Sequence, residues 1–254
     1  MKTVEVKGII IGSGRPKIIV PLVGQTQAAI IEAANYLVSV DCDLVEWRVD
    51  FFEAVADTEQ VIELSQKIRE ILDDKPLLFT FRTKQEGGKY PFTNDQYFHL
   101  YKEMIEKGAL DLLDVELFMP ETAVAEIIDA AHAKGIRIVM CNHDFDQTPS
   151  QAEIVARLRK MQEKHADICK IAVMPQNATD VVTLLAATDE MHTRYADRPL
   201  VTMSMGQLGM ISRLSGEVFG SAMTFGAAKQ ASAPGQVPVA SLRKTLALFS
   251  VTEQ

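Results

Sequence analysis

The chain has 254 residues, 47% of them hydrophobic, and a formal net charge of −8 at pH 7. An apolar share of this size supports a large core and excludes an extensively disordered chain. The acidic balance, without any Lys/Arg cluster, argues against nucleic acid or an anionic membrane surface as a partner. No run of about 18 apolar residues occurs, so no membrane span is predicted.

The cysteines and the first residues bear on the compartment. Three cysteines without a CxxC pair indicate reduced thiols, which are typical of the cytoplasm: Cys42, Cys141 and Cys169. Residues 1–11 carry Glu5 and Lys7 and lack a long apolar core, so they do not resemble a signal peptide. We therefore expect a cytoplasmic protein.

Residues 4–12 predict two short strands around a Lys7-Gly8 turn, which makes residues 1–14 an N-terminal β-hairpin. An apolar strand followed by a stretch of helical periodicity then repeats along the chain. Strands are expected to begin near Ile18, Leu44, Leu77, Asp111, Ile136, Ile168, Leu200 and Ala222. The helices between them include 27–40, 58–72, 94–107, 122–134, 151–164 and 178–195, with Thr58 and Ser150 as candidate N-caps.

Repeated strand–helix units favour an α/β fold with a parallel sheet and right-handed crossovers. Eight such units in a chain of about 250 residues favour a closed (β/α)8 TIM barrel over an open doubly wound sheet. No GxGxxG fingerprint opens the first helix, which weakens the open-sheet alternative. The prediction is a single (β/α)8 barrel domain over residues 1–254, with the hairpin at its N-terminus.

Charged residues fall on one face of the predicted strand 44–50. Because successive residues of a strand point to opposite sides, Glu46, Arg48 and Asp50 share a face, and the apolar residues between them face the helices. The charges then point into the barrel or its mouth, where a salt-bridged pair is the structural alternative to function. Asp114 and Glu116 repeat the pattern on strand 112–116.

The stretch 167–174 predicts a short buried strand with Lys170 at its middle. A buried cation is costly unless it is paired or neutral, and an apolar setting lowers a lysine pKa from its usual value of about 10.4. The resulting free amine is a nucleophile for carbonyl carbons. A lysine at a strand end that reaches solvent is the alternative interpretation of this stretch alone.

Other polar residues gather where the active site of a barrel lies, at the C-terminal ends of the strands. With Lys170 they form a set of six: Glu46, Arg48, Arg82, Glu116, His143 and Lys170. One polar residue there is ordinary, whereas six are hard to explain as packing, so a catalytic site is favoured over a structural ion-pair network. No HExxH motif or paired Cys/His spacing predicts a metal site.

Five segments, taken together, resemble type I 3-dehydroquinate dehydratase, and the resemblance extends from residue 17 to residue 236. They are Glu46-Trp47-Arg48-Val49-Asp50, Phe79-Thr80-Phe81-Arg82 with Glu86-Gly87-Gly88, Asn142-His143-Asp144-Phe145, Lys170-Ile171-Ala172, and Ser232-Ala233-Pro234-Gly235-Gln236. The resemblance implies a (β/α)8 barrel that forms a homodimer in the cytoplasm. It also implies dehydration of 3-dehydroquinate to 3-dehydroshikimate in the shikimate pathway, without a metal or cofactor.

The resemblance assigns roles to individual residues. Lys170 matches the Schiff-base lysine, His143 the acid/base histidine, and Glu86 the carboxylate that orients this histidine. The substrate-binding set matches Glu46, Arg48, Arg82, Arg213, Ser232 and Gln236. Pro21 departs from the pattern, because members of the family often have serine there, and this puts one hydroxyl contact in doubt.

Two other classes stay open at this stage. A class I aldolase also uses a lysine imine on a barrel, but it normally needs a phosphate site, for which a single Gly235 after the last strand is weak support. A ligand-binding barrel without catalysis need not keep Lys170, His143 and Glu86 together. Product formation from 3-dehydroquinate separates the three classes.

Overall fold

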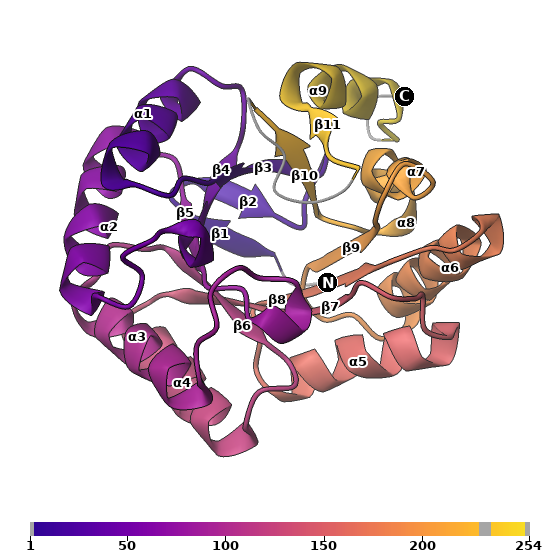
Figure 1. The fold of residues 1–254 in the computed structure, drawn as a ribbon. Helices are drawn as coiled ribbons and strands as arrows, with labels where there is room; N and C mark the ends of the chain where they lie inside the picture. Colours follow the sequence, from indigo (N-terminus) through magenta and orange to yellow (C-terminus); the bar gives the residue numbers. More distant parts are fainter. Residues whose placement is uncertain (1–2, 229–234, 252–254) are drawn as a thin grey trace.

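The computed structural model describes residues 3–228 and 235–251, and Figure 1 shows helices ringing a central sheet. The strands are β1 (Val4–Val6), β2 (Ile9–Ile11), β3 (Lys17–Leu22), β4 (Leu44–Arg48), β5 (Leu77–Thr80), β6 (Leu112–Glu116), β7 (Arg137–Asp144), β8 (Ile168–Val173), β9 (Leu200–Ser204), β10 (Met223–Ala227) and β11 (Val237–Pro238). The α-helices are α1 (Gln27–Val38), α2 (Thr58–Leu72), α3 (Asn94–Lys107), α4 (Glu121–Ala133), α5 (Gln151–Glu163), α6 (Ala178–Arg194), α7 (Met210–Leu214), α8 (Gly216–Phe219) and α9 (Val239–Leu248).

The eight strands from β3 to β10 form the barrel. They pair in parallel and in chain order, β10 pairs with β3, and the short β11 lies beside β10. The remaining seam, between β9 and β10, is joined by a parallel bridge between Leu200 and Ser221 and by the Ala222 N–H, which donates to the Leu200 carbonyl at 2.7 Å. Each of the eight predicted strands lies within one residue of its expected start, so the predicted (β/α)8 barrel is confirmed.

The first six helices agree with the prediction to within two residues at each end. Ser150 caps α5 as predicted, because its side chain accepts the Glu153 N–H at 3.3 Å. The expected cap Thr58 is wrong: Thr58 is the first residue of α2, and Asp57 before it accepts the Gln60 N–H at 3.2 Å. A carboxylate at this position also suits the positive end of the helix dipole.

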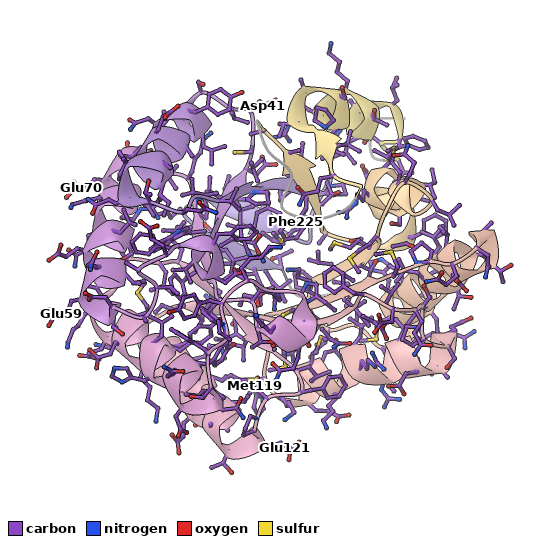
Figure 2. The ribbon with its side chains drawn as sticks, in the orientation of Figure 1. Asp41, Glu59, Glu70, Met119, Glu121 and Phe225 are labelled. Carbon is purple, nitrogen blue, oxygen red and sulfur yellow. The ribbon has the colours of Figure 1, made fainter. Side chains whose placement is uncertain are left out.

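Two apolar layers follow from the alternation of the strands. Val45 and Trp47 of β4 point outward and pack in the large core between the sheet and the helices. Residues of the opposite face fill the barrel interior, among them Leu44 and Leu112. In Figure 2, Phe225 lies toward the centre while charged side chains such as Glu59 project from the outer helices. None of the helices in the described ranges is both long and apolar enough to cross a membrane.

The predicted N-terminal hairpin is confirmed, and it turns at Lys7 and Gly8. Both residues have positive φ, 47° and 78°, which is the geometry of the type I′ turns that match the twist of a two-stranded ribbon. Val4, Val6 and Ile11 are buried, and they belong to the same apolar cluster as the first residues of the barrel strands. The hairpin therefore closes the N-terminal end of the barrel.

Three aspartates brace this end of the barrel, one before each of β4, β6 and β8. Their carboxylates accept the backbone N–H of Ile18, Leu77 and Ile138, at 2.6, 2.7 and 2.7 Å respectively. The aspartates are Asp43, Asp111 and Asp167, and each contacts a basic side chain, respectively Arg243, Arg69 and His132. Each carboxylate thus satisfies a backbone N–H at the start of a strand.

Candidate active site

The opposite end of the barrel, where the strands finish, holds a pocket of about 200 Å³. Eight of the nine residues that the sequence assigned to the site line it: Glu46, Arg48, Arg82, Glu86, His143, Lys170, Arg213 and Gln236. Ser232, the ninth, lies outside the described residues. The remaining lining residues are Phe51, Gly87, Lys89, Phe145, Ala172, Met203, Met205 and Phe225.

Lys170 lies in the middle of β8 and is only 3% exposed. Its ammonium lies 3.4 Å from Asp114 Oδ2 and 3.9 Å from Glu46 Oε1. The ring of Phe225 covers it, with Nζ 4.7 Å from the ring centroid. The setting is therefore not the apolar one expected from the strand sequence, because two carboxylates, on β6 and β4, reach across the barrel interior and pair with the buried cation. The alternative of a lysine reaching solvent is excluded.

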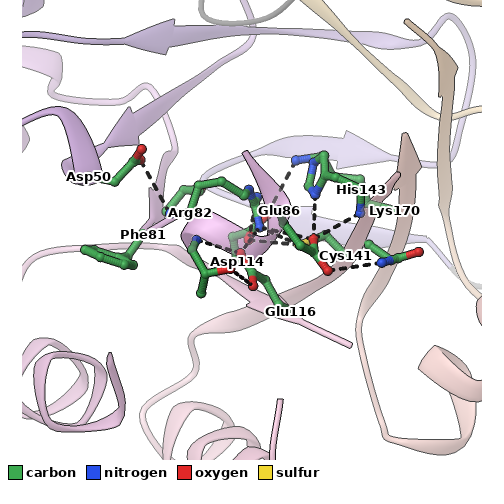
Figure 3. A network of polar contacts seen from close by, with 12 residues as sticks. Asp50, Phe81, Arg82, Glu86, Asp114, Glu116, Cys141, His143 and Lys170 are labelled. Atoms are coloured by element: carbon green, nitrogen blue, oxygen red, sulfur yellow. Dashed lines mark hydrogen bonds and ion pairs between the residues drawn. The ribbon is translucent and has the colours of Figure 1, made fainter. Parts of the chain in front are cut away.

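Arg82 is the centre of the ionic network in Figure 3. Its Nη1 donates to Glu116 Oε1 at 2.8 Å and to Cys141 Sγ at 3.0 Å, and its Nη2 donates to Asp114 Oδ1 at 2.8 Å. Burial opposes the charge of Arg82, but the surrounding acidic groups, Asp114 first, outweigh it and raise its pKa well above the usual value. The guanidinium therefore holds the acidic side chains of the site at fixed positions, and its contact with a substrate stays a prediction.

Glu86 and His143 form a close pair beside this network. Glu86 Oε2 lies 2.8 Å from His143 Nδ1 and also accepts the backbone N–H of His143 at 3.0 Å. Phe145 stacks on the imidazole with ring centroids 6.3 Å apart. Because Nδ1 is held by the carboxylate, Nε2 is the ring nitrogen that can exchange a proton in the pocket.

The environment shifts both members of this pair toward their neutral forms. Burial raises the pKa of Glu86 to about 8, with the charge of Glu116 acting in the same direction. Burial, together with the cations Arg82 and Lys170, lowers the pKa of His143 well below its usual value. The neutral imidazole, the form able to accept a proton, is therefore favoured over the imidazolium.

Gly87 and Gly88 form a tight turn beside the Glu86–His143 pair. Gly87 has φ 87°, and a Cβ there would lie 2.5 Å from the ring of Phe145. A Cβ on Gly88 would lie 1.8 Å from the Arg82 carbonyl, because the Gly88 N–H closes the turn onto the Thr83 carbonyl at 2.7 Å. The two glycines allow a close approach of backbone that holds Glu86 in the buried position.

Two further arginines face the pocket. Arg48 binds Asp50 through two parallel hydrogen bonds of 2.8 and 2.9 Å, and both side chains are buried. The predicted strand 44–50 is too long, because β4 ends at Arg48 and Asp50 lies in the 3₁₀ turn Val49–Phe51. Arg213 comes from α7 and is 2% exposed, with Nη1 3.5 Å from the Met203 sulfur. Burial lowers the pKa of Arg213 to about 10, so it remains a cation at neutral pH and favours an arriving anion.

Three side chains of the site could together contact a metal ion: the ligand atoms of Glu86, Cys141 and His143 lie within 4.8 Å of one another. Burial raises the pKa of the Cys141 thiol well above its usual value, and Arg82 donates to its sulfur. A divalent cation here would have to displace the thiol proton beside a guanidinium. The charge distribution is therefore better suited to proton transfer than to metal binding.

Sequence reasoning left four residues out of the predicted set. Asp114 and Cys141 contact Lys170 and Arg82 from neighbouring strands, and Phe225 covers Lys170. Asn142 donates to Glu86 Oε1 at 3.0 Å. Asp114 could have been identified from the sequence, since it is a charged residue within an apolar strand. Nothing in the residue types of Cys141, Asn142 and Phe225 indicated a part in the site.

Comparison with known proteins places the chain in a family. The model of type I 3-dehydroquinase matches residues 18–253. The 3-dehydroquinate dehydratases of Enterococcus faecalis and Salmonella typhimurium are 60% and 53% identical over 249 residues, which cover 98% of this chain and 98% and 99% of theirs. The type I enzyme of Clostridium difficile, solved with covalently modified comenic acid, superposes with a TM-score of 0.95 at 51% identity and 98% coverage of both chains. The chain belongs to the type I 3-dehydroquinase family.

Proposed function

We propose that the protein dehydrates 3-dehydroquinate to 3-dehydroshikimate through a Schiff base on Lys170, with His143 as the acid/base group. The observation that carries the proposal is a buried amine and a neutral-favouring imidazole on adjacent strands of one pocket. In the β7–β8 register, Cys141 lies opposite Lys170, so that His143 stands two residues further toward the mouth. The relatives' shared name gives the substrate, and the covalent modification in the C. difficile enzyme agrees with a nucleophile in this pocket.

The chemistry needs a nucleophile because the leaving hydroxyl is β to a ketone. The Lys170 amine adds to the ketone and water is lost, which leaves a protonated imine. This cation makes the proton on the adjacent carbon more acidic, since the developing negative charge flows onto nitrogen. The carboxylates of Asp114 and Glu46, 3.4 and 3.9 Å from the lysine nitrogen, would stabilise the positive imine.

The second step needs a base and then an acid on one side of the bound substrate. Neutral His143 takes the proton from the carbon through Nε2 while Glu86 holds Nδ1. The resulting imidazolium donates the same proton to the departing hydroxyl, which leaves as water. Hydrolysis of the product imine then restores the Lys170 amine, so the cycle needs no metal or cofactor.

Substrate binding is assigned to the remaining polar groups of the pocket. Arg213 is the proposed partner of the substrate carboxylate, because its buried cation favours an arriving anion. Arg48, Arg82 and Glu46 face the hydroxyl-bearing ring from the strand ends. Ser232 and Gln236 are proposed to complete the binding set from the chain after β10. Pro21 of β3 offers no side-chain donor, so no hydroxyl contact is assigned there.

The biological setting is proposed with the activity. The reaction places the protein in the shikimate pathway, which supplies aromatic amino acids, and three reduced, buried thiols agree with a cytoplasmic protein. We further propose that residues 1–254 form one domain and that the protein is a homodimer. Gel filtration with light scattering tests the dimer, for which a monomeric mass at micromolar concentration is the contrary result.

Borohydride trapping tests the covalent step. Borohydride added with 3-dehydroquinate reduces the imine to a stable amine, so we expect inactivation and a ligand mass on the peptide that contains Lys170. Lys102→Ala on the surface of α3 is the matched control and keeps the adduct, whereas Lys170→Ala loses it. Turnover should fall at least about 10⁴-fold in Lys170→Ala, as for other catalytic nucleophiles.

Three outcomes would contradict the proposal. An adduct on another lysine, or inactivation without an adduct, would remove Lys170 from the covalent step. A large loss of activity with a chelator would reveal a metal. Turnover of sugar phosphates instead of 3-dehydroquinate would favour an aldolase.

A further inference from the structure

Asn142 connects the catalytic pair to the outer layer of the barrel. It precedes His143 on β7, and its side chain therefore points away from the barrel interior, toward the helices. Asn142 Nδ2 donates to Glu86 Oε1 at 3.0 Å, while Asn142 Oδ1 accepts from Arg157 Nη1 of α5 at 2.9 Å. An unbroken chain of hydrogen bonds thus runs from a surface helix to the imidazole of His143.

Arg157 determines which end of the Asn142 amide faces Glu86. A guanidinium only donates, so it requires the amide oxygen, and the amide NH₂ is left to face the carboxylate. The reverse orientation would set the amide oxygen against the carboxylate and the NH₂ against a cation. Arg157 is itself fixed, with Nε 2.7 Å from Glu153 Oε1 and its guanidinium carbon 5.5 Å from the ring centroid of Phe118.

We propose that Asn142 and Arg157 are positioning residues that direct the Glu86 carboxyl group at His143 and increase the fraction of Glu86 that is ionised. The inference deepens the proposed function and rests on it. Within a buried and largely acidic surrounding, the Asn142 amide is one of the few groups that favour the charged form of Glu86, and Arg157 is what presents it as a donor. Neither residue touches the pocket.

The state of Glu86 decides whether His143 can act as a base. When Glu86 is ionised, it accepts the proton of Nδ1, and Nε2 carries a free lone pair. When Glu86 holds a proton, it donates to Nδ1, and the single proton of the neutral ring moves to Nε2. The protonated carboxyl therefore removes the basic site from the pocket without any change in the total charge of the imidazole.

The experiment compares Asn142→Ala, Arg157→Met and Arg157→Lys with a matched control on the same helix. Arg159→Met is that control, because Arg159 is an exposed arginine of α5 that stacks on Tyr195, with its guanidinium carbon 4.8 Å from the ring centroid. The first readout is the ring-nitrogen NMR spectrum of His143 in the absence of substrate, recorded against pH. The second is the pH profile of kcat and of KM for 3-dehydroquinate.

In Asn142→Ala and Arg157→Met, the Nδ1–H tautomer should appear only at higher pH, at a proton concentration about tenfold lower than in the unchanged protein. A hydrogen bond to a charged group changes an ionisation equilibrium by about this factor. At pH 7 kcat should fall about tenfold with KM unchanged, and alkaline pH should restore it. Arg157→Lys should retain most of the activity, and Arg159→Met should match the unchanged protein.

An unchanged tautomer crossover in Arg157→Met, or a rise in KM with kcat retained, overturns the inference. If Asn142→Ala fails to fold, the half-buried Arg157→Met variant still tests the inference. The NMR readout needs no substrate, so it tests the relay even if the protein proves not to dehydrate 3-dehydroquinate, a result that would refute the proposed function alone.

Discussion

Both ends of the barrel contain acidic side chains, half-buried at the N-terminal end and buried at the mouth, and the two sets are arranged in different ways. At the N-terminal end, each of Asp43, Asp111 and Asp167 accepts one backbone N–H and pairs with one basic side chain, or with two in the case of Asp167. At the mouth, Asp114 and Glu116 share Arg82, and Asp114 also faces Lys170. The aspartates at the N-terminal end make separate local contacts, whereas the acidic side chains at the mouth form one continuous network beside the pocket.

The difference indicates what each end contributes. A carboxylate that satisfies a strand N–H stabilises the fold, because the unpaired donor would otherwise be buried. A cluster of like charges around a lysine does the reverse, since burial raises the pKa of Glu86 and each ionised group costs solvation energy. We therefore expect substitutions at the mouth to lower activity and those at the N-terminal end to lower stability.

The largest loss of activity, relative to any loss of stability, is expected for His143→Ala. The variant keeps the nucleophile and the arginines but lacks the base, so turnover should fall about 10² to 10⁴-fold. Borohydride with substrate should still trap an adduct on Lys170, although slowly, because a histidine also carries protons during imine formation. Near-normal turnover would remove His143 from the mechanism. A folded variant that never forms an adduct would move His143 to the imine step.

Arg213→Ala should weaken substrate binding with little effect on the unfolding free energy. A carboxylate loses a charge-assisted partner worth about 1.5–3 kcal/mol, which is about 10- to 150-fold in the dissociation constant. Titration of 3-dehydroquinate into protein that also carries Lys170→Ala measures binding without turnover. An unchanged dissociation constant would show that Arg213 does not hold the substrate.

Asp111→Ala tests the N-terminal end. The Leu77 N–H and the Arg69 guanidinium both lose their partner, so the free energy of unfolding should fall by about 1–3 kcal/mol in denaturant titration. The kcat of the folded protein should stay unchanged, and Glu70→Ala on the exposed face of α2 should change neither quantity. A fall in kcat as large as that of the mouth variants would contradict the division between the two ends.

A pH dependence of stability is measured by comparing Glu86→Gln with the unchanged protein. Glu86 has a folded-state pKa of about 8, above the usual value of 4.5, so between these values the folded state retains a proton that the unfolded state has released. Stability is therefore lost as pH rises through this window. The variant lacks this loss, so its stability relative to the unchanged protein should increase from pH 5 to pH 8, by up to about 1.4 kcal/mol for each pH unit. A constant difference would mean that Glu86 is already ionised at pH 5.

The barrel could be predicted closely because its strands are apolar runs that recur with helices of clear 3.6-residue periodicity. The same alternation placed Glu46 and Arg48 inside the barrel. The candidate residues came from their chemical type and position at strand ends together with the family resemblance. Those assigned a catalytic or binding role within the described ranges line one pocket, whereas Glu116 lies behind it as a partner of Arg82.

The missed contacts depend on which strands become neighbours and on how their side chains reach across. The pairing of Lys170 with Asp114 joins residues 56 positions apart, and the Asn142–Glu86 contact spans the same separation. The close approach of Gly87 to Phe145 likewise depends on tertiary packing. At the start of α2, Asp57 caps the helix rather than the neighbouring Thr58, because a carboxylate interacts favourably with the partial positive charge of the helix N-terminus.

In the part of the chain that the structure describes, the N-terminal hairpin leaves the pocket accessible only from the opposite end of the barrel. Val4, Val6 and Ile11 close the N-terminal end of the barrel. Apolar side chains fill the interior between these residues and Lys170. Within the described residues the pocket is a blind chamber, so substrate, product and the water released by dehydration share one opening. In the proposed mechanism, the water released by the elimination would therefore leave the imine only through the opening that the substrate uses.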